Sequence, residues 1–177
     1  MPVHLTIIYQ REAFCNNIQR NLFQKPIIMA PATSDHELIR NCIARYCIGV
    51  DLKDWNTFSN AFLDNAKVDF PDLGGPVEGV TAITTTAQSM VGNFQTQHTL
   101  TTQLIEITGE KTANATTYCT ADVFGVGEDE GKRVTNWGLY QDKLVKGIFD
   151  GREDWKIAER IATLAAPLCG DLSLLSK

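Results

Sequence analysis

His98 is the residue of this sequence best suited to proton transfer. The chain has three histidines, and two of them, His4 and His36, lie near the N-terminus, outside the expected core. Imidazole is the side chain whose unperturbed pKa best suits general acid and base catalysis near neutral pH. His98 lies in the alternating segment 96–107, where every second side chain faces a core or a cavity. We therefore take His98 as the first candidate for a catalytic group.

Asp51 is the second candidate for a catalytic group. It follows an apolar helical stripe over residues 39–50, and this position directs Asp51 toward the covered face of the helix. Asp51 either enters a pocket or caps the next helix, and Asp54 stands where it can cap that helix instead. A hydrogen bond from one ring nitrogen of His98 to the Asp51 carboxylate would hold the imidazole in one tautomer. The other nitrogen would then be free to move a proton.

Asn136 and Tyr140 are candidates for polar contacts with a ligand, because alternation places both on one face of the expected strand 133–145. A neutral amide facing a pocket can orient a carbonyl or hydroxyl group, and the alternative for Asn136 is a hydrogen bond to a neighbouring strand. Tyr140 is either a pocket hydroxyl or an ordinary core aromatic. The expected apolar walls of the pocket, which are equally compatible with a plain core, are Val50, Phe70, Met90, Phe94, Val123 and Val134.

The elements that must position these residues are helices first and strands afterwards. A capping box at Ser34 and Glu37 predicts where the first helix begins, and Gly92 predicts where the last one ends. The apolar spacing changes from helical to alternating after Asn93. The expected helices are 34–50, 55–64 and 79–92. The expected strands are 68–70, 96–107, 112–126, 133–145 and 155–163, with a loop at 73–76.

This order predicts an α+β fold in which three N-terminal helices cover one face of a curved antiparallel sheet. A curved sheet closed by helices forms a cone with a central pocket, and such pockets are apolar with a few polar groups. We expect residues 29–177 to form this domain. Residues 1–28 lack a clear period and are expected to be an N-terminal extension outside the working domain.

Composition excludes several classes of function. The chain has 177 residues and a formal net charge of -5, which argues against nucleic acid or an anionic membrane as a partner. Its apolar runs are shorter than the roughly 18 residues that a membrane span needs. The five cysteines form no Cys-x-x-Cys pair, so neither a zinc site nor a disulfide framework is indicated. We expect a cytoplasmic protein that uses no metal and no organic cofactor.

Several short strings follow one another at specific distances. They are Arg45-Tyr46, Asp51-Leu52-Lys53-Asp54-Trp55, Val68-Asp69-Phe70, Glu78-Gly79, Thr96-Gln97-His98 and Trp155-Lys156-Ile157-Ala158. Their order, which covers about residues 34–165, resembles the SnoaL-like domains of the nuclear-transport-factor-2-like superfamily. The resemblance implies the same helix-covered cone and a small-molecule site inside it.

Within that superfamily, the scytalone dehydratases provide the nearest functional template. The resemblance implies that their catalytic Asp falls on Asp51, their Thr-Gln-His string on residues 96–98 and a ligand-contacting Asn on Asn136. The chain also departs from this template, because Val50 and Phe70 replace two pocket tyrosines. A second histidine of the template falls near Gly125 and a serine near Val134, so the fold carries over but the same dehydration does not.

Two functions from different classes follow. The first is a cofactor-independent lyase or isomerase of secondary metabolism, in which Asp51 and His98 form a general acid/base pair and Asn136 positions a hydrophobic, oxygenated small molecule. Its reaction would be a dehydration, isomerisation, cyclisation or rearrangement. The alternative is a non-catalytic binding or interaction module on the same fold, which the missing tyrosines also allow.

The outer face of the sheet is expected to form a homodimer in either case. A sheet with helices on one face leaves its other face to be covered. Alternation places Tyr118, Thr120 and Trp137 on that outer face, where they suit sheet-to-sheet packing.

Overall fold

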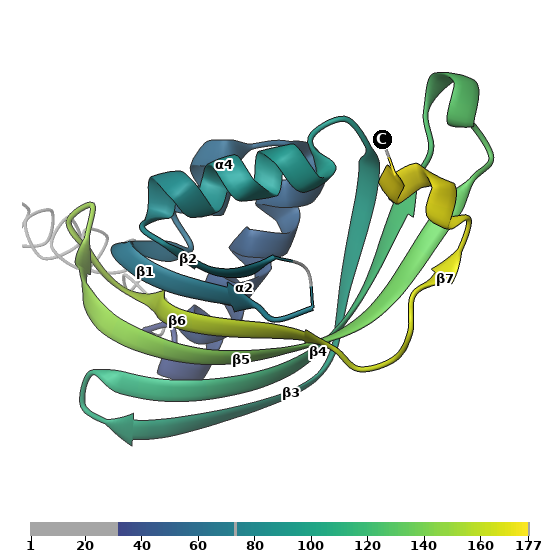
Figure 1. Ribbon diagram of the computed structural model, residues 1–177. Helices are drawn as coiled ribbons and strands as arrows, with labels where there is room; N and C mark the ends of the chain where they lie inside the picture. Colours follow the sequence, from purple (N-terminus) through teal and green to yellow (C-terminus); the bar gives the residue numbers. More distant parts are fainter. Residues whose placement is uncertain (1–31, 73, 177) are drawn as a thin grey trace, which may run out of the picture. The chain divides into compact units, whose positions relative to one another are not determined.

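The architecture comes from a computed structural model that describes residues 32–72 and 74–176 (Figure 1). The predicted extension over residues 1–28 lies outside the described residues. The helices are α2 (Asp35–Leu52), α3 (Trp55–Ser59) and α4 (Val80–Val91), with the short 3₁₀ helices η1 (Gly127–Asp129) and η2 (Leu172–Ser176). The strands are β1 (Phe62–Phe70), β2 (Gly75–Glu78), β3 (Gln95–Gly109), β4 (Thr112–Phe124), β5 (Arg133–Phe149), β6 (Arg152–Leu164) and β7 (Cys169–Gly170).

The first helix begins where the sequence predicts it. The Ser34 hydroxyl accepts a hydrogen bond from the Glu37 amide and so satisfies one free N–H of the first turn of α2. The predicted apolar stripe is buried along its length, from Ile39 to Val50. That stripe contacts β3 and β6, so the last turn of α2 lies against the sheet. This placement matters because Asp51 is in that turn.

The second helix is shorter than predicted. Asp54 caps α3 through the Thr57 amide, as expected, but the helix ends at Ser59 and Phe62 already begins β1. The prediction of helix to residue 64 was therefore wrong. Phe58 and Phe62 keep a helical spacing, but Phe62 is fully buried as a strand residue that pairs with Ile157 of β6. Tertiary packing determines the conformation of such a short apolar segment.

The predicted loop at 73–76 contains the start of a strand. Gly75 to Glu78 form β2, which pairs antiparallel with β1. The strand is only four residues long and includes Pro76, which suits its position at the sheet edge. Gly79 then leads into α4 as predicted.

The fold class is confirmed: three α-helices among the described residues accompany one curved sheet. Its strand order is β2-β1-β6-β5-β4-β3, and β7 pairs with β5. The sheet is larger than the predicted meander of four long strands, and it is mixed, because β1 is parallel to β6. Figure 1 shows α2 and α4 on the concave side of this sheet and the C-terminal η2 beside the ends of β4 and β5.

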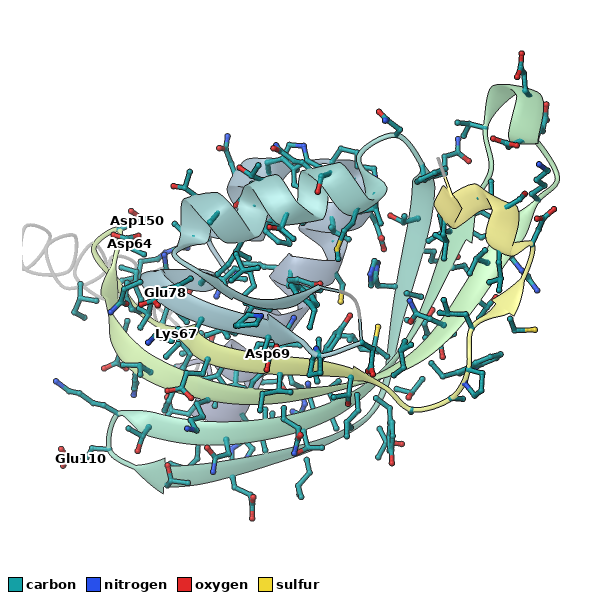
Figure 2. All side chains as sticks on the ribbon, in the orientation of Figure 1. Asp64, Lys67, Asp69, Glu78, Glu110 and Asp150 are labelled. Carbon is teal, nitrogen blue, oxygen red and sulfur yellow. The ribbon has the colours of Figure 1, made fainter. Side chains whose placement is uncertain are left out.

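Charged side chains occupy the edge and the hairpin ends of the sheet. Lys67 of β1 and Glu78 of β2 form an exposed ion pair on the edge strands. Figure 2 places Glu110 and Asp150 at two hairpin ends, at the end of the sheet opposite η2. Exposed charges of this kind discourage edge-to-edge association. The end of the sheet near η2, in contrast, contains the cavities described next.

Candidate active site

His98 and Asp51 lie in direct contact. His98 on β3 places its Nδ1 2.6 Å from Oδ1 of Asp51, which is in the last turn of α2. Both side chains are mostly buried, with exposed fractions of 11% and 17%. An ionised carboxylate can only accept, so Nδ1 carries the proton and donates it. In the neutral ring, Nε2 is then an acceptor, and no described residue bonds it.

Asp51 is held by two further donors. The His98 amide donates to Oδ2 at 2.7 Å, and the Thr96 hydroxyl donates to Oδ1 at 2.9 Å. Burial alone would raise the pKa of Asp51, but the hydrogen bonds from His98 and Thr96 lower it below its usual value. Asp51 is therefore a fixed, ionised partner for the imidazole. Asp54, and not Asp51, caps the next helix.

Lys53 supports this carboxylate from the solvent side. Its backbone adopts a left-handed conformation, with φ 59°, where α2 ends. Its Nζ donates to the Thr96 hydroxyl at 3.2 Å, so Lys53, Thr96 and Asp51 form a short chain of hydrogen bonds. Burial lowers the pKa of Lys53. Sequence pattern did not identify Lys53 or Thr96 as supports of Asp51, because their role depends on the contact between α2 and β3.

An inner cavity of about 120 Å³ lies beside His98. Six of the ten residues expected at the site line this cavity: Val50, Phe70, Met90, His98, Asn136 and Tyr140. The lining also includes Ala121, which pairs with His98 of β3 on one side and with Asn136 of β5 on the other. His98 and Asn136 are thus separated by one small side chain and by two strand spacings, roughly 10 Å. A ligand that lies over Ala121 can touch both.

A larger outer cavity of about 550 Å³ adjoins the inner one. Phe94, Val123 and Val134, the remaining expected wall residues, line this second cavity and not the first. Met90, Val91 and Asn136 line both, so the two cavities lie side by side. Three leucines of the C-terminal segment complete the outer wall: Leu168, Leu174 and Leu175.

Tyr46 and Tyr140 line the inner cavity, and their rings make cation–π contacts with the buried guanidinium of Arg160. The guanidinium carbon of Arg160 lies 4.3 Å and 4.2 Å from the centres of their rings. Arg160 forms a bidentate ion pair with Asp142, at 2.6 and 2.8 Å, and both side chains are fully buried. Burial raises the pKa of Tyr46 to about 12, so the group remains a neutral phenol. Its position, one helical turn before Val50, is the signal that could have identified it.

The departures from the dehydratase template are visible in the structure. Val50 and Phe70 present apolar side chains to the inner cavity where the template has tyrosines. Gly125 cannot be replaced by a second histidine, because a Cβ there would lie 2.1 Å from the Asp129 carbonyl oxygen. The polar side chains in the lining of the inner cavity are those of His98, Asn136, Thr163 and the two tyrosines Tyr46 and Tyr140.

Within residues 32–72 and 74–176, no three His, Cys, Asp or Glu side chains gather as they would around a metal ion. The expectation of catalysis without metal or cofactor remains a prediction. None of the helices described is long and apolar enough to cross a membrane.

Comparison with known proteins adds the family. The model of the SnoaL-like domain matches residues 31–161. The terrestric acid biosynthesis cluster protein E of Penicillium crustosum is 31% identical over 136 residues, which cover 75% of this chain and 84% of that protein.

Solved structures show the same fold at low sequence identity. A putative scytalone dehydratase from Novosphingobium aromaticivorans is 21% identical, with a TM-score of 0.64, and the match covers 76% of this chain and 85% of that one. A hexachlorocyclohexane dehydrochlorinase from Novosphingobium barchaimii is 14% identical, also with a TM-score of 0.64, over 76% and 88% of the two chains. These similarities establish the helix-covered curved sheet for this chain.

Proposed function

The chain belongs to the SnoaL-like domain family, and from that premise we propose that it is a cofactor-independent lyase or isomerase. Its substrate is a hydrophobic, oxygenated small molecule, and its reaction is a dehydration, isomerisation, cyclisation or rearrangement. The observation that carries the proposal is the 2.6 Å contact between His98 Nδ1 and Asp51 Oδ1 at the wall of an apolar cavity.

The geometry supports different roles for Asp51 and His98. Asp51 holds the proton on Nδ1, so Nε2 of His98 acts as the general base toward a substrate in the inner cavity. After it has taken a proton, the ring is an imidazolium beside Asp51 and can return the proton to another substrate atom. One such group contributes about 10²–10⁴-fold to a rate. Eliminations and double-bond shifts both begin with this proton abstraction.

Asn136 and the two tyrosines are assigned to the substrate's oxygen. No described residue bonds the Asn136 amide, which lines the cavity and can donate to a carbonyl oxygen. Burial also raises the pKa of Tyr140 well above its usual value, so both tyrosines are donors and not bases. Donors aimed at an oxygen that gains negative charge stabilise the transition state.

The names of related proteins fit this class of reaction. The Penicillium relative is named for a biosynthesis cluster, which favours secondary metabolism as the setting of this chain. A dehydratase and a dehydrochlorinase, by their names, remove water and hydrogen chloride. Each of these eliminations needs a base and a site that excludes bulk water.

The test is hydrogen exchange into a panel of model substrates. Neutral cyclic ketones and enones with one ring are incubated with the protein in D₂O, and deuterium at the α-carbon is measured by mass spectrometry. We expect the wild-type protein to accelerate exchange in at least one compound, and His98→Ala to lower that rate by about 10²-fold or more. Asp51→Asn should lower it as well, because the ring loses the partner that sets its tautomer.

His36→Ala is the matched control, because His36 is an exposed histidine in the first turn of α2, away from the cavity lining. It should keep the wild-type exchange rate. Equal exchange rates for the wild-type protein and His98→Ala would refute the proposal. If ketones bind but the wild-type protein exchanges no faster than buffer, the non-catalytic binding module is the correct function.

We also propose that the working domain covers residues 29–177 and that it forms a homodimer through the outer sheet face. Tyr118 and Trp137 are 51% and 41% exposed on that face, although both are large aromatic side chains. Burial of such side chains between two sheets would remove apolar surface from water. A cytoplasmic location remains a prediction.

A further inference from the structure

The two cavities differ in size and in polarity. The inner one, about 120 Å³, contains His98 and Asn136, whereas the outer one, about 550 Å³, is lined mostly by aliphatic side chains. An apolar cavity of roughly 150 Å³ holds one benzene molecule. The inner cavity is slightly smaller than that and can hold at most one six-membered ring, whereas the outer cavity exceeds what such a ring needs.

The inner cavity imposes a position on that ring. Ala121 lies between His98 and Asn136 in the paired row across β3, β4 and β5. A ring over Ala121 can present one oxygenated carbon to Asn136 and an acidic C–H to His98. Because Met90 and Asn136 also line the outer cavity, a substituent on the ring that extends past these two residues points toward the outer cavity.

The walls of the outer cavity are suited to binding an uncharged aliphatic group. Val134 and Leu174 in its wall are 3% and 1% exposed, so they are packed core residues and not surface side chains. Its carboxylate, Asp129, is bonded to Lys132 at 2.8 Å and is thereby neutralised. Val126 and Leu175 remain 41% and 47% exposed, which leaves apolar surface that a ligand can cover.

We propose that the substrate has two parts: a compact oxygenated ring that occupies the inner cavity and an uncharged aliphatic tail that occupies the outer one. This inference rests on the proposed function for the identity of the ring's oxygen contacts. It adds that the C-terminal segment, through Leu168 and Leu174, recognises the tail and so determines specificity.

The experiment uses a series of 4-n-alkylphenols, from phenol to hexylphenol, as unreactive probes. Binding to the full chain is measured by protein-observed NMR titration. We expect affinity to increase by up to about fourfold for each added methylene, as for burial of a methylene in an apolar site. Phenol itself should shift the signals of His98 and Ala121, and the longer members should in addition shift the methyl signals of Val134.

Variants separate the two cavities. Leu168→Trp begins from a partly exposed side chain, so the fold tolerates it, and the larger group fills the outer cavity. It should abolish the gain per methylene while phenol binds as before. Ala121→Leu, in the inner cavity, should weaken every member of the series and leave the gain per methylene unchanged. Ile148→Trp, at an exposed position of β5 away from both cavities, is the control and should match the wild-type protein.

The outcomes distinguish this inference from the proposed function. A wild-type affinity that does not depend on chain length, or an unchanged gain per methylene in Leu168→Trp, would overturn the two-part substrate. Neither result affects the requirement for His98 in hydrogen exchange. Conversely, a chain-length effect in a protein whose His98→Ala variant exchanges normally would support the two-part site and refute the proposed chemistry.

Discussion

At the scale of single residues, the site depends on how Asp51 is held. Its two oxygens accept from the His98 ring, the His98 amide and the Thr96 hydroxyl. Three donors leave the carboxylate little freedom to rotate, so the imidazole is fixed in both orientation and tautomer. The same bonds that prepare the base for catalysis also attach the end of α2 to β3.

This attachment predicts a dependence of stability on pH. The pKa of Asp51 in the folded protein lies below its usual value of 3.8. The stability that the ionised carboxylate contributes is therefore fully present above pH 3.8 and is lost as the pH falls through the lower pKa of the folded state. Asp51→Asn should therefore cost about 1–3 kcal/mol of unfolding free energy at pH 6. The cost should be smaller at pH 3. Urea unfolding of both proteins at the two pH values measures it, and an equal cost at both would contradict the prediction.

At the scale of elements, the inner cavity exists because two neighbouring strands, β4 and β5, have small residues in its wall. Between Asn136 and Tyr140, β5 has Gly138, and the neighbouring strand β4 has Ala121. A Cβ at Gly138 would meet its nearest neighbours at 3.5–3.9 Å, which is ordinary contact. The strand therefore has room for a side chain at this position, and the absence of one leaves the inner cavity open.

Gly138→Val should keep the fold and remove the site. Valine suits a strand better than glycine does, so the melting temperature should equal or exceed that of the wild-type protein. The new side chain enters the inner cavity, so phenol binding and ketone exchange should both be lost. Thermal unfolding and NMR titration measure the two effects. Leu139→Val, which changes the next residue on the opposite face, is the control, and phenol binding retained in Gly138→Val would contradict the prediction.

At the scale of the whole molecule, the outer sheet face exposes several large apolar side chains. The strand register places Leu104, Thr116, Gln141 and Ile161 in one row across β3 to β6. Leu104 and Ile161 are 60% and 44% exposed. Together with Tyr118 and Trp137 they form the outer-face patch, which is the surface that the proposed homodimer would bury.

The homodimer is tested by sedimentation velocity at micromolar concentration. We expect a dimer for the wild-type protein and a monomer for the double variant Tyr118→Glu/Trp137→Glu, because buried like charges would oppose each other across the interface. Leu172→Glu, at an exposed position of η2, should remain dimeric. A monomeric wild-type protein would refute the proposal.

Some features of the fold and the site were predictable because they depend on local pattern. The Ser34 cap, the stripe of α2 and the long strands β3 to β6 each follow from residues close together in sequence. The β1 start at Phe62 was not predictable in this way, since a short apolar segment fits a helix or a strand. Its pairing with β6, which is far along the chain, decided the conformation.

The sequence by itself determined the family, the order of the elements and the pair of side chains, Asp51 and His98, that is proposed to move a proton. Only the tertiary structure decided that Lys53 and Thr96 support Asp51, that Arg160 underlies the tyrosines and that the expected walls divide into two cavities. The physical reason is that chemistry resides in residue types, which a sequence displays directly. A cavity is the space left between side chains distant in sequence, and it exists only after they have packed.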